Sequence, residues 1–403
     1  MNKIPQNAYL TFKYNQSLGR HGWLRLTPAY SVKIVEFVLT KLNYSPQHIL
    51  EPFSGTGTTE LVCANNGIPA TAYDVNPFLV WLAKVKTKIY HREILTTFND
   101  VANDIIKNLP YVSPCHYPPI YNIERWWNAK QLNYLARLKN IIFEQKDSCI
   151  CDLLKIAFCR QIIELSNISF NHISTSFNEN NETSDGFTDE IGDLFFLKSC
   201  EMISNTLKEQ PKAKICIKKQ NSLDIPIDMI NNYDTVITSP PYPNRISYIR
   251  ELRPYMYWLD YLKTTSEASE LDWKTIGGTW GSATSKLADW KSQTNLLPCG
   301  LLEIAEKIAQ VSNKSAQLMA NYVLKYFDDM ALHFQSIFQT IKSGGSIHYI
   351  VGNSSFYGYV IPSDLIYKEI LSQIGFQNIT IVIVRKRNCN KHLYEYCISA
   401  LKP

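Results

Sequence analysis

Two stretches of this sequence combine residue types that could do chemistry, and the first is a glycine-containing turn. EPFSGTGTT, residues 51–59, follows a short apolar segment and enters a segment with helical character. Gly55 and Gly57 permit backbone conformations and a close approach that side chains would block, and the first amides of a helix favour an anionic group. Asp74 ends the next expected strand, where an acidic residue commonly accepts hydrogen bonds from the ribose hydroxyls of a nucleoside cofactor. The turn and the acid together predict a nucleoside site, whereas Glu60 in place of a third glycine disfavours a dinucleotide dehydrogenase.

The second stretch is YDTVITSPPY, residues 233–242, in which an apolar strand runs into Ser239-Pro240-Pro241-Tyr242. Such a strand end lies at the carboxyl edge of an α/β sheet, where ligands bind. The two prolines fix the backbone, so the Ser239 hydroxyl and the Pro240 carbonyl can form a rigid pair of acceptors for the two hydrogens of an amino group. Tyr242 offers a stacking face for a planar base. The alternative is a plain proline-rich turn, and the neighbouring glycine turn and acid favour a site.

With both motifs in view, the sequence resembles the S-adenosylmethionine-dependent DNA amino-methyltransferases. EPFSGTGTT looks like the cofactor motif of that family, Asp-Pro-Phe-x-Gly-x-Gly-Thr-Thr, and SPPY is similar to its catalytic motif in the form typical of cytosine-N4 members. Adenine-N6 members more often carry Asp or Asn in place of the serine. RLTPAYSVKIVEFVL resembles the segment that closes over the methionine end of the cofactor. The resemblance covers roughly half of the chain, around residues 20–90, 212–260 and 340–403.

The resemblance also implies which residues form the site. The implied catalytic residues are Ser239, Pro240, Pro241 and Tyr242. Glu51 and Asn221 stand where the family usually has Asp, which could alter the affinity for the cofactor, and Asn221 falls near the expected position of its adenine. The residues implied to bind S-adenosylmethionine are Thr27, Pro28, Glu51, Pro52, Phe53, Ser54, Gly55, Thr56, Gly57, Thr58, Thr59, Asp74, Val75, Asn76, Asn221 and Ser222.

The implied reaction is a direct methyl transfer to an exocyclic amine of a DNA base. Such an amine is a poor nucleophile because its lone pair conjugates into the ring, and Ser239 and Pro240 would pull it toward tetrahedral geometry. In-line transfer then needs orientation and charge stabilisation, with no covalent enzyme intermediate. A base in a duplex must leave the stack to reach such a site, and Tyr242 is its expected stacking partner. Methylation at cytosine C5 needs an attacking thiolate and is disfavoured, because Cys299, which follows a proline, is expected in an irregular segment.

Basic residues near the motifs are the expected DNA contacts. Arg245, Arg250 and Arg253 follow SPPY among tyrosines, and the last two are neighbours on one expected helix face. Lys386 and Arg387 belong to the densest basic cluster, in a hairpin turn. Ordinary surface or salt-bridge roles for the arginines, and a solvated turn for the cluster, stay open as alternatives.

The elements that must position these residues alternate between strand and helix. We therefore expect an α/β fold with a parallel sheet, and the resemblance implies a class I methyltransferase (Rossmann-like) core with a mostly parallel seven-stranded sheet. Residues 1–90, 212–261 and 319–403 are expected to form that core, interrupted by a helical insertion at 91–211 and a second insertion at 262–318, each a possible DNA-recognition region. Strands are expected at 48–50, 70–73, 214–218, 233–238, 346–351, 379–384 and 394–400, and helices at 31–42, 58–65, 132–143, 153–165 and 194–207.

Composition limits the classes of function. The 403 residues include 41 Lys+Arg against 36 Asp+Glu, a net charge of +5, so a basic surface for DNA must come from clustering. No apolar run reaches the roughly 18 residues of a membrane span, the start lacks signal-peptide character, and the ten cysteines form no CxxC pair. These features predict a cytoplasmic protein with reduced thiols, without a metal site or a disulfide framework.

Together the motifs predict site-specific methylation of cytosine N4 in double-stranded DNA, with base flipping and S-adenosylmethionine as the cofactor. The resemblance implies a restriction-modification system, in which a cognate restriction endonuclease would act separately. The alternatives are an adenine-N6 DNA methyltransferase, an RNA or protein amine methyltransferase, and a catalytically idle nucleic-acid-binding module.

Overall fold

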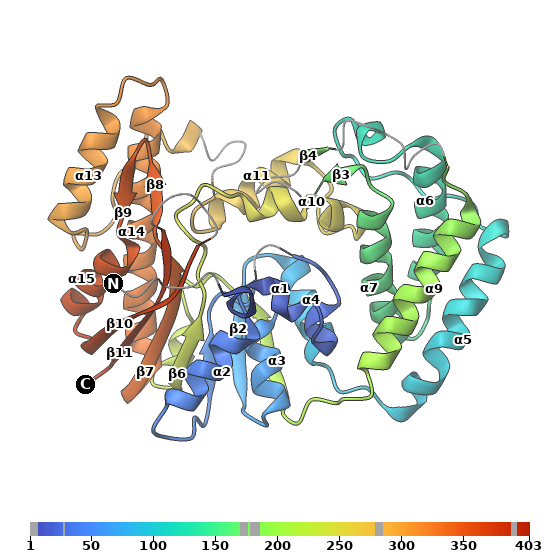
Figure 1. Ribbon diagram of the computed structural model, residues 1–403, viewed down its shortest axis with the longest axis horizontal. Coiled ribbons are helices and arrows are strands. Elements are labelled where there is room, and N and C mark those ends of the chain that lie inside the picture. The colour runs from blue at the N-terminus through green and yellow to red at the C-terminus, as the bar shows by residue number, and fades with distance from the viewer. Residues whose placement is uncertain (1–6, 27–28, 170–175, 178–185, 279–284, 388–392) are drawn as a thin grey trace.

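A mostly parallel sheet forms the centre of the computed structural model, which describes residues 7–26, 29–169, 176–177, 186–278, 285–387 and 393–403. Within these residues, seven strands form one sheet in the order β10-β11-β7-β6-β1-β2-β5 (Figure 1). Neighbouring strands from β7 to β5 are parallel, and β11 is antiparallel to both β7 and β10. This order, with one antiparallel strand beside the edge strand, is that of a class I methyltransferase and confirms the expected fold class.

The bounds of the elements are as follows. The strands of the sheet are β1 (Ile49–Glu51), β2 (Ala70–Asp74), β5 (Ile215–Lys219), β6 (Tyr233–Thr238), β7 (Ile341–Gly352), β10 (Gln377–Lys386) and β11 (Tyr394–Leu401). Two short hairpins pair β3 (Ile168–Ser169) with β4 (Ser176–Phe177) and β8 (Ser354–Phe356) with β9 (Tyr359–Ile361). The helices are α1 (Phe12–Asn15), α2 (Val32–Lys41), α3 (Thr58–Asn65), α4 (Pro77–Thr87), α5 (Arg92–Asn108), α6 (Ala129–Phe143), α7 (Ser148–Glu164), α9 (Asp189–Thr206), α10 (Tyr248–Trp258), α11 (Thr265–Lys274), α13 (Cys299–Ala309), α14 (Ala316–Thr340) and α15 (Ser363–Ile374).

The expected elements agree with the observed ones, most closely where local signals are strong. Strand β6 and helix α3 have the expected bounds, and Ser31 caps α2 by accepting a hydrogen bond from the Lys33 amide at 3.2 Å. The largest difference among the strands is in β7, which begins at Ile341, before the expected start. The sequence KSGG at 342–345 has the composition of a turn, and it lies at a shift in register, because Tyr233 of β6 pairs with Ile341 whereas Thr235 pairs with Ser346.

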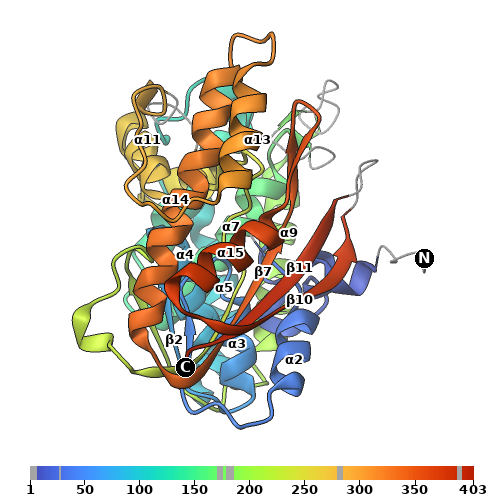
Figure 2. The ribbon, with the colours of Figure 1, turned by 90° about the vertical axis from the view of Figure 1, so that its left-hand side faces the viewer.

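Different helices cover the two faces of the sheet. Successive side chains of a strand point to opposite faces, so Ile49 packs with residues of α2 and α3, whereas Leu50 packs with residues of α14 and α15. Ile237 and Val236 of β6 divide in the same way. Figures 1 and 2 show the resulting three layers, with α14 as a long helix along one face. Helix α14 therefore packs on the face of the sheet formed by Leu50 of β1 and Val236 of β6, the two strands that lead into the sequence motifs.

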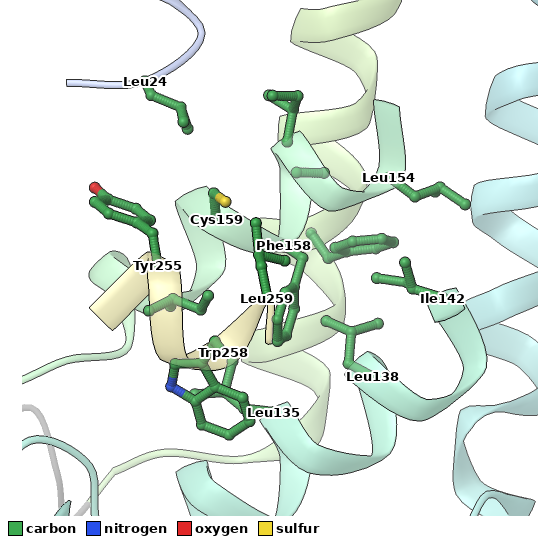
Figure 3. Close-up of a cluster of buried hydrophobic side chains, with 14 of the residues drawn as sticks. Leu24, Leu135, Leu138, Ile142, Leu154, Phe158, Cys159, Tyr255, Trp258 and Leu259 are labelled. Atoms are coloured by element: carbon green, nitrogen blue, oxygen red, sulfur yellow. The ribbon is translucent and has the colours of Figure 1, made fainter. Parts of the chain in front are cut away.

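The first insertion forms a group of helices beside the sheet. Helices α5, α6, α7 and α9 pack on one another (Figure 1), and their apolar core continues into α10. Figure 3 shows this junction, where Trp258 of α10 lies among side chains of α6 and α7. The ring centroids of Trp258 and Phe158 are 5.8 Å apart, and those of Trp258 and Trp127 are 5.7 Å apart. The helix that follows the SPPY turn is therefore anchored in the insertion.

The second insertion is partly helical. It contains α11 and α13, and α13 packs against α14 and the β8–β9 hairpin (Figure 2). Cys299, which we expected in an irregular segment, is the first residue of α13 and is exposed. The helix forms because Leu301, Ala305 and Ile308 give it an apolar side that α14 buries.

Three further properties concern the described part of the chain. None of its helices has both the length and the apolar character needed to cross a membrane. The nine cysteines that fall within it are free thiols. It also contains no group of three His, Cys, Asp or Glu side chains placed to hold a metal ion.

Candidate active site

A cavity of about 250 Å³ lies at the carboxyl ends of four neighbouring parallel strands, β5, β2, β1 and β6. Its lining includes the glycine turn after β1, the end of β2 at Asp74, the residues 220–222 after β5, and the SPPY turn after β6. Parallel strands bring their carboxyl ends to one edge of the sheet, and ligands of α/β proteins bind there. The fold thus joins the two motifs that the sequence separates by about 180 residues.

Most residues implied by the resemblance reach this cavity. All four residues of the SPPY turn line it. Glu51, Gly57 and Thr59 are buried behind the lining, and Thr27 and Pro28 lie outside the described residues. The cofactor-binding candidates that line the cavity are Pro52, Phe53, Ser54, Gly55, Thr56, Thr58, Asp74, Val75, Asn76, Asn221 and Ser222.

Asp74 links the end of β2 to the glycine turn. Its Oδ2 accepts a hydrogen bond from the Gly55 amide at 2.9 Å, and its Oδ1 accepts one from the Asn76 amide at 2.8 Å. Burial raises the pKa of the Asp74 carboxyl to about 6, and the backbone amides only partly offset this effect. An ionised carboxylate has about four lone-pair sites, so it can still accept hydrogen bonds from a ligand's hydroxyl groups while it holds both backbone segments.

The glycine turn needs its glycines for two separate reasons. Gly55 and Gly57 have φ angles of +51° and +77°, in the left-handed region that favours glycine. A Cβ on Gly57 would also lie 3.1 Å from the Cβ of Ala83 in α4. The turn therefore packs closely on α4, and residues 52–56 line the cavity.

The buried side chain of Glu51 links three neighbouring segments by hydrogen bonds. It is fully buried, and its carboxylate accepts hydrogen bonds from the Thr59 hydroxyl at 2.5 Å, the Phe53 amide at 3.0 Å and the Thr238 hydroxyl. Burial raises the pKa of this carboxyl well above its usual value. The carboxylate ties β1 to α3 and to the end of β6, which sets the glycine turn against the strand that leads into SPPY.

Two further charged groups lie beneath the glycine turn. The Lys86 ammonium donates a hydrogen bond to the Thr56 carbonyl at 2.9 Å, and burial lowers the pKa of Lys86 to about 8. Glu60, at the position of a third glycine, is also buried, and this raises the pKa of its carboxyl to about 7. Lys86 was not a candidate from the sequence, because nothing in its local surroundings shows that α4 passes under the turn.

The SPPY turn is held by hydrogen bonds that leave specific acceptors toward the cavity. The Ser239 hydroxyl donates to the Ile350 carbonyl at 3.1 Å, and the Tyr326 hydroxyl donates to the Pro241 carbonyl at 2.7 Å. After donating its hydrogen, the Ser239 oxygen presents only lone pairs to a ligand. A hydroxyl oxygen in this state can accept a hydrogen bond from a donor group such as an amine.

The ring of Tyr242, the last residue of the SPPY turn, lies against Gly352 at the end of β7. A Cβ on Gly352 would be 3.0 Å from the Cδ2 and Cε2 atoms of the Tyr242 ring, so any other residue there would push the ring or the strand aside. The guanidinium carbon of Arg387 lies 5.6 Å from the ring centroid. Both contacts hold the ring in place beside the cavity, and burial raises the pKa of the Tyr242 phenol well above its usual value.

The five basic residues expected to contact DNA have different surroundings. Arg387 lines the cavity, and Lys386 precedes it at the end of β10. Arg245 and Arg250 are exposed. Arg253 instead lies with its guanidinium carbon 4.9 Å from the centroid of the Trp126 ring, and burial lowers its pKa.

The cavity also has lining residues that were not sequence candidates. Arg385 and Glu395 form a two-pronged ion pair, with Nε to Oε2 at 2.6 Å and Nη2 to Oε1 at 2.5 Å. They pair across the β10–β11 hairpin, so opposite charges at facing hairpin positions were a signal in the sequence. Lys274, Thr275 and Ile276 reach the cavity from the second insertion, and only the fold reveals this.

Comparison with known proteins gives relatives that match nearly the whole chain. The chain is 24% identical over 422 residues to the type II methyltransferase M.AvaI of Nostoc sp., covering 95% of this chain and 85% of that protein. It is 24% identical over 443 residues to the type II methyltransferase M.BsoBI of Geobacillus stearothermophilus (94% and 83%) and 21% identical over 406 residues to M.MvaI of Kocuria varians (93% and 86%). No family model matches. Among solved structures, the rRNA methyltransferase aviRa from Streptomyces viridochromogenes aligns with 98% of this chain and 96% of its own at a TM-score of 0.34 and 11% identity.

Proposed function

We propose, on the premise that this chain is a homologue of the type II methyltransferases, that it methylates the exocyclic N4 amine of cytosine at specific sites in double-stranded DNA. The cofactor would be S-adenosylmethionine, the setting a restriction-modification system in the cytoplasm, and any cognate restriction endonuclease a separate protein. The homology supports the assignment as a methyltransferase, and the geometry of the SPPY turn supports an amine as the methyl acceptor.

The observation that carries the proposal is the direction of the Ser239 hydrogen bond. While Ser239 donates its hydrogen to the Ile350 carbonyl at 3.1 Å, its oxygen offers a substrate lone pairs and no donor. Tyr326 occupies the Pro241 carbonyl, which leaves the Pro240 carbonyl as the second acceptor of the proposed pair. Two acceptors suit the two hydrogens of a cytosine or adenine amino group, and they discriminate against the carbonyl oxygens of guanine and thymine.

The residues present fit S-adenosylmethionine. Asp74 retains acceptor sites for the ribose hydroxyls. Asn221 and Ser222 also line the cavity, and the resemblance implies that the adenine lies near Asn221. Asn221 closes its own turn, since its Oδ1 accepts from the Leu223 amide at 3.1 Å. An amide oxygen serves that purpose as well as a carboxylate does, so the substitution of the usual Asp is compatible with binding. When bound, this cofactor supplies an electrophilic methyl group.

The chain's own part in the reaction is to hold the amine and its base. Ser239 and Pro240 would accept both amine hydrogens and direct the nitrogen lone pair into the cavity, which provides orientation at little entropic cost during the reaction. Tyr242, fixed by Gly352 and Arg387, would stack on the flipped base. The serine form of the motif favours cytosine N4 over adenine N6, an argument that rests on the resemblance.

DNA would approach from the side of the cavity, between the two insertions. Arg245, Arg250, Lys386 and Arg387 are the proposed phosphate contacts. Arg253 packs over Trp126, so we expect its main contribution to be the attachment of α10 to the helical insertion. The insertions at 91–211 and 262–318 remain the proposed recognition regions, and Lys274 to Ile276 link the second one to the cavity.

Nucleoside mass spectrometry tests this proposal directly. Unmodified DNA of mixed sequence is incubated with the protein and S-adenosylmethionine, then digested to nucleosides. We expect N4-methylcytosine. N6-methyladenine would keep the mechanism and correct the base. If no methylated base is found in the DNA, the proposal is overturned, whether the protein methylates RNA or protein instead or transfers no methyl group at all.

A further inference from the structure

One helix reaches both sides of the candidate site. Tyr326 and His333 lie seven residues apart on α14, hence on the same helix face. The Tyr326 hydroxyl donates to the Pro241 carbonyl at 2.7 Å, in the turn expected to hold the substrate amine. His333 Nδ1 lies 2.8 Å from the Ser222 carbonyl, in the turn expected to hold the cofactor adenine. Both side chains are at most 1% exposed, so each contact is made within the core.

The hydrogens of the tyrosine contact can be assigned from chemistry alone. A carbonyl oxygen only accepts, so the single hydroxyl hydrogen of Tyr326 points to Pro241. Tyr367 of α15 lies 2.6 Å from the Tyr326 oxygen, and it must therefore be the donor in that second bond. The chain of bonds runs from Tyr367 to Tyr326 to Pro241, with no hydrogen left over for the cavity.

The histidine contact has an equally defined direction. Burial lowers the pKa of His333 to about 4, so the ring is neutral at neutral pH and carries one hydrogen. Ser222 presents a carbonyl, which places that hydrogen on Nδ1. Nε2 then accepts from the Tyr349 hydroxyl at 2.6 Å. The ring centroid of His333 is also 4.7 Å from that of Phe53, in the glycine turn.

We propose that Tyr326 and His333 are positioning residues that hold the substrate turn and the cofactor turn in fixed relation to each other through α14. This inference rests on the proposed function. Tyr326 keeps the Pro241 carbonyl turned into the core, so that the neighbouring Pro240 carbonyl is the one offered to the amine. His333 supports two separate parts of the cofactor side, the Ser222 carbonyl and the Phe53 ring. Methyl transfer depends on the alignment of the amine with the methyl group, so both turns must keep their relative positions. A displacement of the reacting groups by about 1 Å can reduce the rate about a hundredfold.

Separate variants test the Tyr326 contact and the His333 contact. Tyr326→Phe removes only the hydroxyl, and we expect kcat to fall by about 10- to 100-fold, while the Kd for S-adenosylmethionine, measured by calorimetry, changes less than about twofold. His333→Leu should raise that Kd by about tenfold. His333→Asn should restore most of the affinity, because its side-chain amide can donate to Ser222 from a position near that of Nδ1.

A matched control is Tyr233→Phe. Tyr233 is fully buried, begins β6 and does not line the cavity, and its hydroxyl lies 3.2 Å from that of Tyr73. This variant should change neither kcat nor the cofactor Kd beyond about twofold, although it also loses a buried hydroxyl group. Thermal unfolding of all variants shows whether any effect follows general destabilisation.

The outcomes separate this inference from the proposed function. The inference is overturned if His333→Leu binds S-adenosylmethionine like the unaltered protein, if Asn is no better than Leu at position 333, or if Tyr233→Phe loses as much kcat as Tyr326→Phe. If the unaltered protein binds the cofactor but methylates no DNA, the proposed function fails. The cofactor Kd of the His333 variants, measured by calorimetry without DNA, still tests the inference in that case.

Discussion

The Ser239 hydroxyl donates its hydrogen to the Ile350 carbonyl oxygen across 3.1 Å, from the end of β6 to the neighbouring strand β7. A serine hydroxyl can usually donate or accept. Here the sheet uses its donor, so the side chain is left with lone pairs directed elsewhere. The chemical preference of the site therefore depends on a contact with a residue more than a hundred positions away in the sequence.

Removal of this hydroxyl should separate catalysis from cofactor binding. In Ser239→Ala we expect methyl transfer to fall by about 100-fold or more, because one of two orienting acceptors is lost. The Kd for S-adenosylmethionine should stay nearly the same. Ser199→Ala is the control, since Ser199 is a buried serine that accepts from Arg160 at 3.2 Å, away from the cavity. Parallel losses of transfer and of cofactor affinity in Ser239→Ala would contradict its assigned role.

Cofactor affinity should depend on pH through Asp74. The pKa of this carboxyl is raised to about 6 by burial, so it is ionised and fully able to accept hydroxyl hydrogens above pH 6. Affinity should decrease as the pH falls through about 6, when protonation removes an acceptor. Calorimetry between pH 5 and 8 should show this dependence in the unaltered protein and in Asp228→Asn, an exposed acid used as the control.

Asp74→Asn should remove most of that pH dependence and weaken binding by about 1–3 kcal/mol, the range expected for a lost charged hydrogen bond. A variant that binds with unchanged affinity would remove the ribose contact from the proposal. A variant that is weak but keeps the full pH dependence would show that another group titrates.

Gly352→Ala should disturb Tyr242. The added Cβ would lie 3.0 Å from two atoms of the Tyr242 ring and 3.3 Å from Cδ of Arg387, so the ring or the strand must move. Such overpacking typically costs about 1–3 kcal/mol, and we expect a loss of kcat with little change in cofactor affinity. Gly300→Ala in α13 is the matched control, because no atom lies within 4 Å of the added Cβ. Full activity in Gly352→Ala would argue against a stacking role for Tyr242.

Arg250 and Arg253 should behave differently despite their proximity on α10. Arg250 is exposed, so Arg250→Ala should weaken DNA binding and reduce the slope of log K against log salt by about 1, as expected for one lost phosphate contact. Arg253 packs over Trp126 at 4.9 Å, so Arg253→Ala should mainly lower the thermal stability. Equal changes in salt dependence for both variants would place Arg253 on the DNA side as well.

Sequence reasoning was sufficient where the signal is local. The glycine turn, the SPPY strand end and the β6 and α3 bounds each depend on a few consecutive residues whose backbone preferences and periodicity are visible in the chain. Asp74 could be identified because one strand-turn-helix-strand unit links it to the turn. The family resemblance then supplied the number of strands, which the structure confirms for the described residues.

Contacts between distant segments could not be read in this way. Nothing near Tyr326 or His333 in the sequence distinguishes them from the other buried residues of α14, and Gly352 resembles any glycine at the end of a strand. Arg250 and Arg253 looked equivalent until the helical insertion placed Trp126 beside only one of them.

Local signals in the chain therefore identify the chemical groups of the site and the turns that carry them, because rigid turns and strand ends depend on neighbouring residues. How those groups are used depends on the packing of distant segments. It directs the Ser239 hydrogen into the sheet, buries Asp74 enough to raise its pKa, and brings one face of α14 against both turns of the site. Hydrogen-bond direction and desolvation depend on what packs around a group, and packing is set by segments that are remote in the chain.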